Sequence, residues 1–164
     1  MDDQMRTATA SDSRAIFEIL TELACKVPLL LDTPERRMAL LEQVKYCCGQ
    51  GKSWVSQDQN GRVVGFLLGK EYSVEVRGHE FAALQLLYGG VKGTHQNQGR
   101  FKSLLAQAKV EGVALRVVVN HRNKSKVADR LLGEGFVRVV PSPLLERADE
   151  ETFDWTPNNA PVQG

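Results

Sequence analysis

Apolar residues at helical spacing open the chain. Ser11 or Asp12 can cap a first helix, in which apolar side chains recur every three or four residues. Thr33 followed by Pro34 is a typical start of a second helix, which the pattern ends at Gly49. The expected buried positions are Ile16, Ile19, Leu20 and Leu23 in the first helix and Met38, Leu41, Val44 and Cys48 in the second. We therefore expect the chain to begin with two amphipathic helices.

Extended apolar runs follow Gly51. Residues 54–57 and 63–68 flank Asn60-Gly61, a dipeptide typical of the turn in a β-hairpin. A third run, residues 81–91, follows a turn at Gly78 and is expected to add the next strand of the same sheet. The middle of the chain thus predicts an antiparallel arrangement of strands.

A strand, a helix and another strand follow one another between residues 81 and 119. Leu104, Leu105 and Ala108 indicate a helix over residues 98–111, and residues 113–119 are almost continuously apolar, as in a strand covered on both faces. Because the crossover in such a unit is right-handed, its two strands are expected to lie parallel and adjacent.

The C-terminal part of the chain predicts shorter elements. A fourth helix is expected at about residues 124–132, stopped by Gly133 or Gly135 before a strand at residues 136–140. Residues 152–155 are expected to form a last edge strand, and an exposed edge could support a homodimer. Residues 157–164 are rich in Pro and Asn and are expected to fray.

Composition and charge narrow the class of protein. A chain of 164 residues with 42% hydrophobic and 25% charged residues fits one globular domain over residues 1–164. A formal net charge of +1 provides no overall field for nucleic acid or anionic membranes. The sequence contains no secretory signal and no apolar stretch of about 20 residues, so a cytoplasmic protein is expected. The three cysteines, Cys25, Cys47 and Cys48, have neither disulfide nor metal-ligand spacing, and we predict no metal site.

The loop and helix start at residues 96–101 carry the strongest chemical signal. A helix start after a glycine-containing loop presents unpaired N–H groups and the positive end of the helix dipole, which can hold a phosphate. Gly99 allows close approach of the backbone, while Lys92, Arg100 and Lys102 supply positive charge for a diphosphate or a nucleotide 3′-phosphate. The alternative is an ordinary strand-to-helix turn with solvated cations.

The same segment resembles the acetyl-coenzyme A signature of the Gcn5-related N-acetyltransferase (GNAT) family. Residues 91–105, VKGTHQNQGRFKSLL, resemble its pattern of a strand-ending Val, four residues, Arg or Gln, two residues, Gly, one residue, Gly or Ala, and a Leu-Leu helix. Asn123 and the later Gly135-Phe136 resemble the family's second motif. The resemblance covers roughly residues 5–140. It implies an α/β (α+β) fold: a mixed, mostly antiparallel twisted sheet with a parallel splayed pair, flanked by about four helices.

The resemblance also implies how the cofactor binds. Backbone groups near Val91 are expected to pair with the pantetheine arm, the amides of residues 96–101 to hold the diphosphate, and Asn123 to contact the cofactor from the other wall. The residues so implied are Gly90, Val91, Gln96, Asn97, Gln98, Gly99, Arg100, Phe101 and Asn123. The activity implied is transfer of an acetyl group from acetyl-coenzyme A to the primary amine of a small molecule or a protein, by direct attack on the thioester.

The chain departs from the family pattern at the proton-transfer positions. Leu131 stands where many members have a Tyr acid, and Gln85 where some have a Glu base. The ring of Phe101, at a position usually Gly or Ala, must turn into the core to leave room for phosphates. Substitute catalytic candidates are His79, Tyr88 and His121, each of which also fits a turn, surface or core role. Glu71 and Glu75 are candidates for recognising a cationic amine, or are the solvated end of a strand.

Two other functions fit parts of the sequence. The missing Tyr and Glu equivalents favour a non-catalytic domain that binds or senses acyl-coenzyme A. A nucleic-acid binder would use Lys92, Arg100, Lys102, Lys109, Arg122, Lys124 and Lys126. Near-neutral net charge and the lack of interleaved aromatic residues argue against nucleic acid. No membrane partner is expected either.

Overall fold

A computed structural model describes residues 4–24, 31–96, 98–120, 126–139 and 150–157. In these residues, seven strands form one sheet with the order β1-β2-β3-β4-β5-β7-β6. The strands are β1 Gln4–Thr7, β2 Trp54–Gln57, β3 Val63–Val76, β4 His79–Val91, β5 Ala114–Asn120, β6 Val137–Val139 and β7 Glu150–Trp155. All neighbours pair antiparallel except β4 and β5, which are parallel. The predicted mixed sheet is therefore confirmed.

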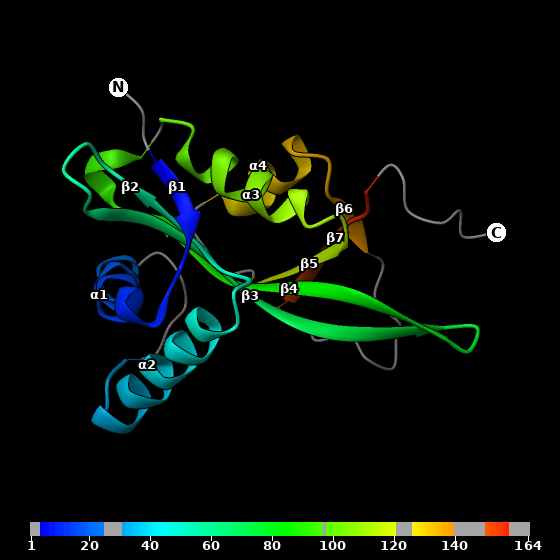
Figure 1. Ribbon diagram of the computed structural model, residues 1–164, viewed down its shortest axis with the longest axis horizontal. Helices are drawn as coiled ribbons and strands as arrows, with labels where there is room; N and C mark the ends of the chain where they lie inside the picture. The colour runs from blue at the N-terminus through cyan, green and yellow to red at the C-terminus, as the bar shows by residue number, and fades with distance from the viewer. Residues whose placement is uncertain (1–3, 25–30, 97, 121–125, 140–149, 158–164) are drawn as a thin grey trace.

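Helices cover both faces of the sheet (Figure 1). Helices α1 (Ser13–Leu23) and α2 (Pro34–Gly49) lie on one face, and α3 (Arg100–Val110) and α4 (Val127–Gly133) on the other. Short 3-10 helices, η1 (Ala10–Asp12) and η2 (Gly93–His95), precede α1 and α3. Each face has its own apolar core: Ile16, Val44 and Phe66 belong to the first, and Leu104, Leu115 and Phe153 to the second. None of the described helices is both long and apolar enough to cross a membrane.

The N-terminal elements follow the sequence pattern with three exceptions. Asp12 precedes α1, but its side chain makes no capping hydrogen bond to that helix. Helix α2 starts as predicted, with the Thr33 hydroxyl accepting a hydrogen bond from the Arg36 N–H at 3.2 Å. The chain does not begin with a helix, because β1 comes first and pairs with β2 at the edge of the sheet. The prediction that Met38 is buried is wrong: it is 57% exposed, and Leu40 and Cys47 pack into the core instead.

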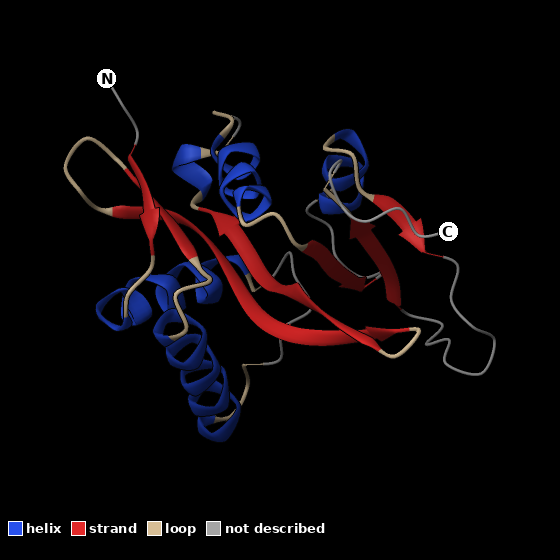
Figure 2. Ribbon diagram, turned by 45° about the vertical axis from the view of Figure 1, so that its right-hand side comes forward, coloured by secondary structure: helices blue, strands red, loops and turns tan. Residues whose placement is uncertain are grey.

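Two hairpins build the antiparallel part of the sheet. At the first, Gly61 takes a φ of +78°, a conformation that glycine adopts without steric cost. At the second, Arg77 and Gly78 both have positive φ, as a two-residue type I′ turn requires. Strands β3 and β4 are both longer than the apolar runs predicted, and they form a ribbon that extends beyond the rest of the sheet (Figure 2).

A β-bulge in β4 separates its paired part from its unpaired part. Leu68 pairs with Tyr88 and Gly69 with Leu86, so Leu87 is an extra residue. The parallel pairing of β4 with β5 runs from Ala83 and Ala114 to Leu86 and Val117 and stops there, although both strands continue. The two strands therefore part at the bulge, which confirms the predicted splayed pair.

The C-terminal strands differ from the prediction. Strand β7 lies between β5 and β6, so the expectation that residues 152–155 form an edge strand is wrong, and the basis it offered for a homodimer is lost. The edge on this side is β6, a strand of three residues. The predicted fourth helix is α4, while residues 124–125 and 158–164 lie outside the described part of the chain.

Candidate functional site

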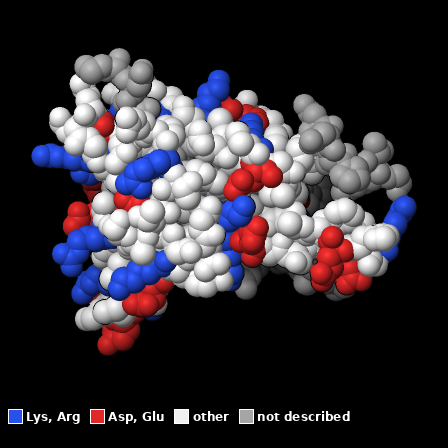
Figure 3. Space-filling view, in the orientation of Figure 1, with Lys and Arg blue, Asp and Glu red and all other residues white. Residues whose placement is uncertain are grey.

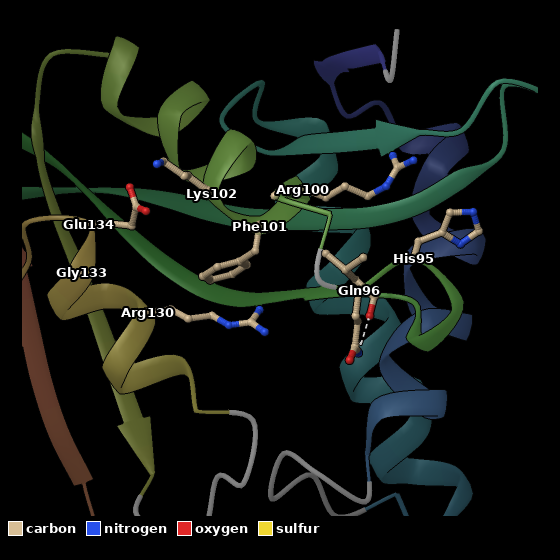
Figure 4. Close-up of a pocket in the computed structure, with 10 residues that line it drawn as sticks. His95, Gln96, Arg100, Phe101, Lys102, Arg130, Gly133 and Glu134 are labelled. Atoms are coloured by element: carbon tan, nitrogen blue, oxygen red, sulfur yellow. Dashed lines mark hydrogen bonds between the residues drawn. The ribbon is translucent and has the colours of Figure 1, made fainter. Parts of the chain in front are cut away.

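A groove of about 420 Å³ opens at the start of α3. The end of β4 and the turn after it form one wall, the first turn of α3 forms the base, and the C-terminal half of α4 forms the other wall (Figure 4). Its lining residues are Val91, His95, Gln96, Gly99, Arg100, Phe101, Lys102, Arg130, Gly133 and Glu134. The groove thus lies where β4 and β5 have separated, and it contains five of the nine residues predicted to bind the cofactor.

The first turn of α3 has no side-chain cap. Gly99 precedes it in the left-handed conformation, with φ +75°, and a Cβ atom there would meet nothing within 4 Å. The helical hydrogen bonds begin with the Ser103 N–H, which donates to the Gly99 carbonyl at 3.0 Å. The preceding N–H groups, at residues 100–102, therefore have no helical acceptor. Together with the helix dipole, they make the groove base suitable for an anion.

The end of β4 is held so that part of its backbone faces the gap. The Lys92 N–H donates to the Val64 carbonyl of β3 at 2.8 Å. Because backbone groups alternate along a strand, those of Val91 and Gly89 point the other way, toward the unpaired edge. The Gln96 side-chain amide donates to the Val91 carbonyl at 2.9 Å and fixes the intervening turn (Figure 4). A Cβ atom at Gly90 would lie 2.5 Å from Leu23 Cδ1, so a larger residue there would require the end of the Leu23 side chain to move.

The Arg100 side chain does not serve the role that the sequence suggested. Only 5% of Arg100 is exposed, and its guanidinium donates to the Ser56 hydroxyl at 2.8 Å and to the Gln57 carbonyl at 3.3 Å. Its Nε also donates to Gln98 at 3.2 Å. The guanidinium points away from the groove and anchors α3 to β2, so the expectation that it supplies charge to a phosphate is corrected (Figure 4). Its backbone N–H remains at the helix start.

The Phe101 ring turns away from the helix start. It packs against the second apolar core, and its Cε2 lies 3.2 Å from where a Cβ of Gly89 would be. The expected turn of the ring into the core is therefore confirmed. Across the groove, the Arg130 guanidinium lies 5.9 Å from the ring centroid. Sequence reasoning missed Arg130 and Glu134, although their spacing of four residues places them on one face of a helix.

Tyr88 lies on the opposite face of the sheet from the groove. It packs against the core beneath α1 and α2, and its hydroxyl donates to Gln43 of α2 at 3.4 Å. Burial raises the pKa of Tyr88, so its phenol stays protonated at neutral pH. The residue is on the part of β4 that borders the gap, just after the bulge.

Other predicted residues lie elsewhere. His79 is exposed at the tip of the β3–β4 ribbon, about 40 Å along β4 from Val91 at ~3.3 Å per residue. The prediction that it is a catalytic residue is therefore wrong. Glu71 lies 3.9 Å from Lys52, which also pairs with Glu111 beside the end of α3, and therefore faces the α3 side of the sheet. Asn97, His121 and Asn123 lie outside the described residues.

Within the residues that the structure describes, the other chemistry-bearing groups form no second centre. Cys47 and Cys48 are buried free thiols, and burial raises the pKa of both, which suits core packing rather than nucleophilic attack. No group of His, Cys, Asp or Glu in the described ranges could hold a metal. On the face in Figure 3, basic and acidic side chains are interspersed over the residues drawn in colour, unlike a nucleic-acid surface.

Comparisons with known proteins extend these observations. No protein-family model matches the sequence, and no curated protein matches it either. Solved structures do match. NAA60 of Arabidopsis thaliana, in complex with acetyl-CoA, is 15% identical with a TM-score of 0.68, covering 94% of this chain and 99% of that one.

Two microbial structures match over similar lengths. PaiA N-acetyltransferase of Thermoplasma acidophilum, in complex with coenzyme A, is 14% identical with a TM-score of 0.65, covering 95% and 99%. An acetyltransferase of the GNAT family from Desulfovibrio desulfuricans, described as putative, is 14% identical with a TM-score of 0.69, covering 94% and 99%. The chain therefore has the fold of the GNAT acetyltransferases.

Proposed function

We propose that the protein is an acetyltransferase that transfers an acetyl group from acetyl-coenzyme A to a primary amine. The observation that carries this proposal is the uncapped, glycine-led start of α3 at the base of a groove that opens where two parallel strands part. The site suits a ligand with a long arm and a diphosphate. The structures that share the fold include complexes with acetyl-CoA and coenzyme A, which agrees with this ligand.

The pantetheine arm is proposed to lie along the open edge of β4, where the backbone of Gly89 and Val91 faces the gap. The diphosphate would then rest on the N–H groups at the start of α3. Tyr88 lies on the other face of the sheet, just after the bulge, and we propose that the thioester and the amine meet near the bulge.

The reaction needs two proton transfers. The neutral amine attacks the thioester carbonyl, a C–N bond forms, the C–S bond breaks, and the attacking nitrogen loses a proton to a base or to water. The thiolate that leaves takes up a proton, for which we propose the Tyr88 phenol. His121 stays a candidate base, outside the described residues.

Calorimetry and a thiol-release assay test this function. We expect acetyl-coenzyme A to bind and free thiol to appear with at least one member of a panel of small amines and peptides. Tyr88→Phe is expected to lower kcat by about 100-fold or more while leaving acetyl-coenzyme A affinity unchanged. Failure of the wild-type protein to bind acetyl-coenzyme A in calorimetry would refute the proposal.

A second candidate is a domain that binds acyl-coenzyme A without turnover. Leu131 is 1% exposed and buried in the core at the position where many of these enzymes have a Tyr acid, and Gln85 cannot act as a base. Cofactor binding with thiol release no faster than hydrolysis, for every amine tried, would favour this alternative.

A further inference from the structure

Arg130 and Phe101 face each other across the groove. Arg130 is on α4, Phe101 is the second residue of α3, and both side chains extend into the space between these helices (Figure 4). The guanidinium carbon lies 5.9 Å from the centre of the ring. A cation over the face of an aromatic ring is weakly attracted to it when the pair is exposed, so the guanidinium can also bind a ligand.

No carboxylate in the described part of the chain forms an ion pair with Arg130. Glu134, one helical turn further along α4, is bound by Lys109, which lies 3.9 Å from its carboxylate and 2.6 Å from its carbonyl oxygen. Among the described residues, the contact recorded for the Arg130 guanidinium is the Phe101 ring. Arg100, the cation nearest in sequence to the helix start, is turned toward Ser56. Of the two arginines that line the groove, Arg130 is therefore the one whose guanidinium remains beside it.

Phe101 fixes where that charge lies. Its ring is half-buried in the second core and rests against the backbone of β4 at Gly89, so it cannot swing freely. Because Phe101 belongs to the first turn of α3, a guanidinium held over its ring lies in the same groove as the N–H groups of that turn. An anion on those N–H groups would be within reach of a planar donor that can bind two oxygens at once.

We infer that Arg130 binds the diphosphate of the acyl-coenzyme A ligand, with the Phe101 ring as the platform that orients its guanidinium. This inference rests on the proposed function, since it concerns the same groove. It also accounts for an aromatic residue at a position where the family signature has Gly or Ala: the ring does not cover the helix start, and it directs a cation from α4 toward it.

Calorimetry with three ligands distinguishes a contact to the diphosphate from a contact to the 3′-phosphate. Acetyl-coenzyme A carries the diphosphate and the 3′-phosphate, 3′-dephospho-acetyl-coenzyme A carries the diphosphate alone, and S-acetylpantetheine carries neither. We expect Arg130→Gln to weaken the first two by the same factor, about 10- to 100-fold, and to leave the third unchanged. Phe101→Leu, which keeps an apolar side chain, is expected to give a smaller loss with the same two ligands.

Arg138→Gln is the matched control. Arg138 also lies over an aromatic ring, 5.5 Å from the centre of Phe153, but on β6 and beside Glu151. Its substitution should leave all three affinities unchanged. Equal affinities for wild type and Arg130→Gln with every ligand would overturn the inference, as would a loss confined to acetyl-coenzyme A, which would place Arg130 at the 3′-phosphate. A wild-type protein that binds none of the three would instead refute the proposed function.

Discussion

The helices of this protein begin in two different ways. At α2, the Thr33 hydroxyl caps the first turn, and at η1, the Asp12 carboxylate accepts from the Thr9 N–H at 2.8 Å and from Arg6 at 2.8 Å. At α3, the residue before the first turn is Gly99, which has no side chain to cap it. The capped starts stabilise the fold. The starts of η2 and α4 also receive no side-chain cap, and among these starts that of α3 forms the base of the groove. What distinguishes the start of α3 is therefore the groove in front of its first turn, where a ligand can bind the helix end.

The largest effect is expected from placing a carboxylate at the uncapped start. Gly99→Glu should abolish binding of acetyl-coenzyme A, because a negative charge would occupy the place proposed for the diphosphate. At 100 times its dissociation constant, the ligand should stabilise wild type by about 2.7 kcal/mol, and this thermal shift should vanish in the variant.

Gly51→Glu controls for backbone strain. Gly51 has a φ of +76°, close to that of Gly99, and is also surrounded by open space, but it follows the end of α2. Both variants should lose about 1 to 2 kcal/mol of stability without ligand, because both force a side chain into the left-handed conformation. An intact ligand shift in Gly99→Glu would place the site elsewhere.

An intermediate effect is expected at the capped start of η1. Asp12→Asn should lower the free energy of unfolding at pH 7 by about 1.5 kcal/mol, because it removes a charged partner of Arg6. The hydrogen bonds from Arg6 hold the pKa of Asp12 below its usual range. The contribution of the carboxylate is therefore complete above its unfolded pKa of about 4 and disappears as the pH falls through the lowered pKa.

Urea titrations of wild type and Asp12→Asn from pH 7 to pH 2 check this sign. The difference in unfolding free energy should shrink toward acid pH. A difference that stays constant, or grows, would mean that the Asp12 charge does not stabilise the fold.

The smallest effect is expected at the cap of α2. Thr33→Ala should cost about 1 kcal/mol of stability, because the Arg36 N–H loses its acceptor. Acetyl-coenzyme A affinity should not change, since α2 does not line the groove. Denaturation and calorimetry measure the two quantities separately, and a parallel loss of affinity would show that the two kinds of helix start are not independent.

Local signals in the sequence predicted most elements. The Thr33-Pro34 start, the Asn60-Gly61 turn and the Gly99 helix start each depend on a few neighbouring residues, and each is confirmed. Strand β1 was missed because four residues at an edge, half of them exposed, carry little pattern. The place of β7 inside the sheet depends on pairing between distant segments, which periodicity cannot show.

Errors at the site have a related cause. Alternation along β4 places His79 and Gln85 on the same face of the strand but does not say how far apart they lie. His79 lies at the tip of the β3–β4 ribbon, far from the groove. The direction of the Arg100 side chain depends on Ser56, which is 44 residues earlier. Arg130 reaches the groove only because α3 and α4 pack on the same face.

Because of the bulge at Leu87, deleting one residue from β4 and inserting one residue into it have different structural effects. Leu86, just before the extra residue, faces the α3 face of the sheet, and Tyr88, just after it, faces the α2 face. Deleting Leu87 would restore regular alternation and keep every later side chain on its present face. Adding one residue after Tyr88 would turn every later side chain to the opposite face of the sheet. Gly90 and Val91 would then each face the core that the other faces now. Evolution of this strand can thus tolerate shortening here far better than lengthening.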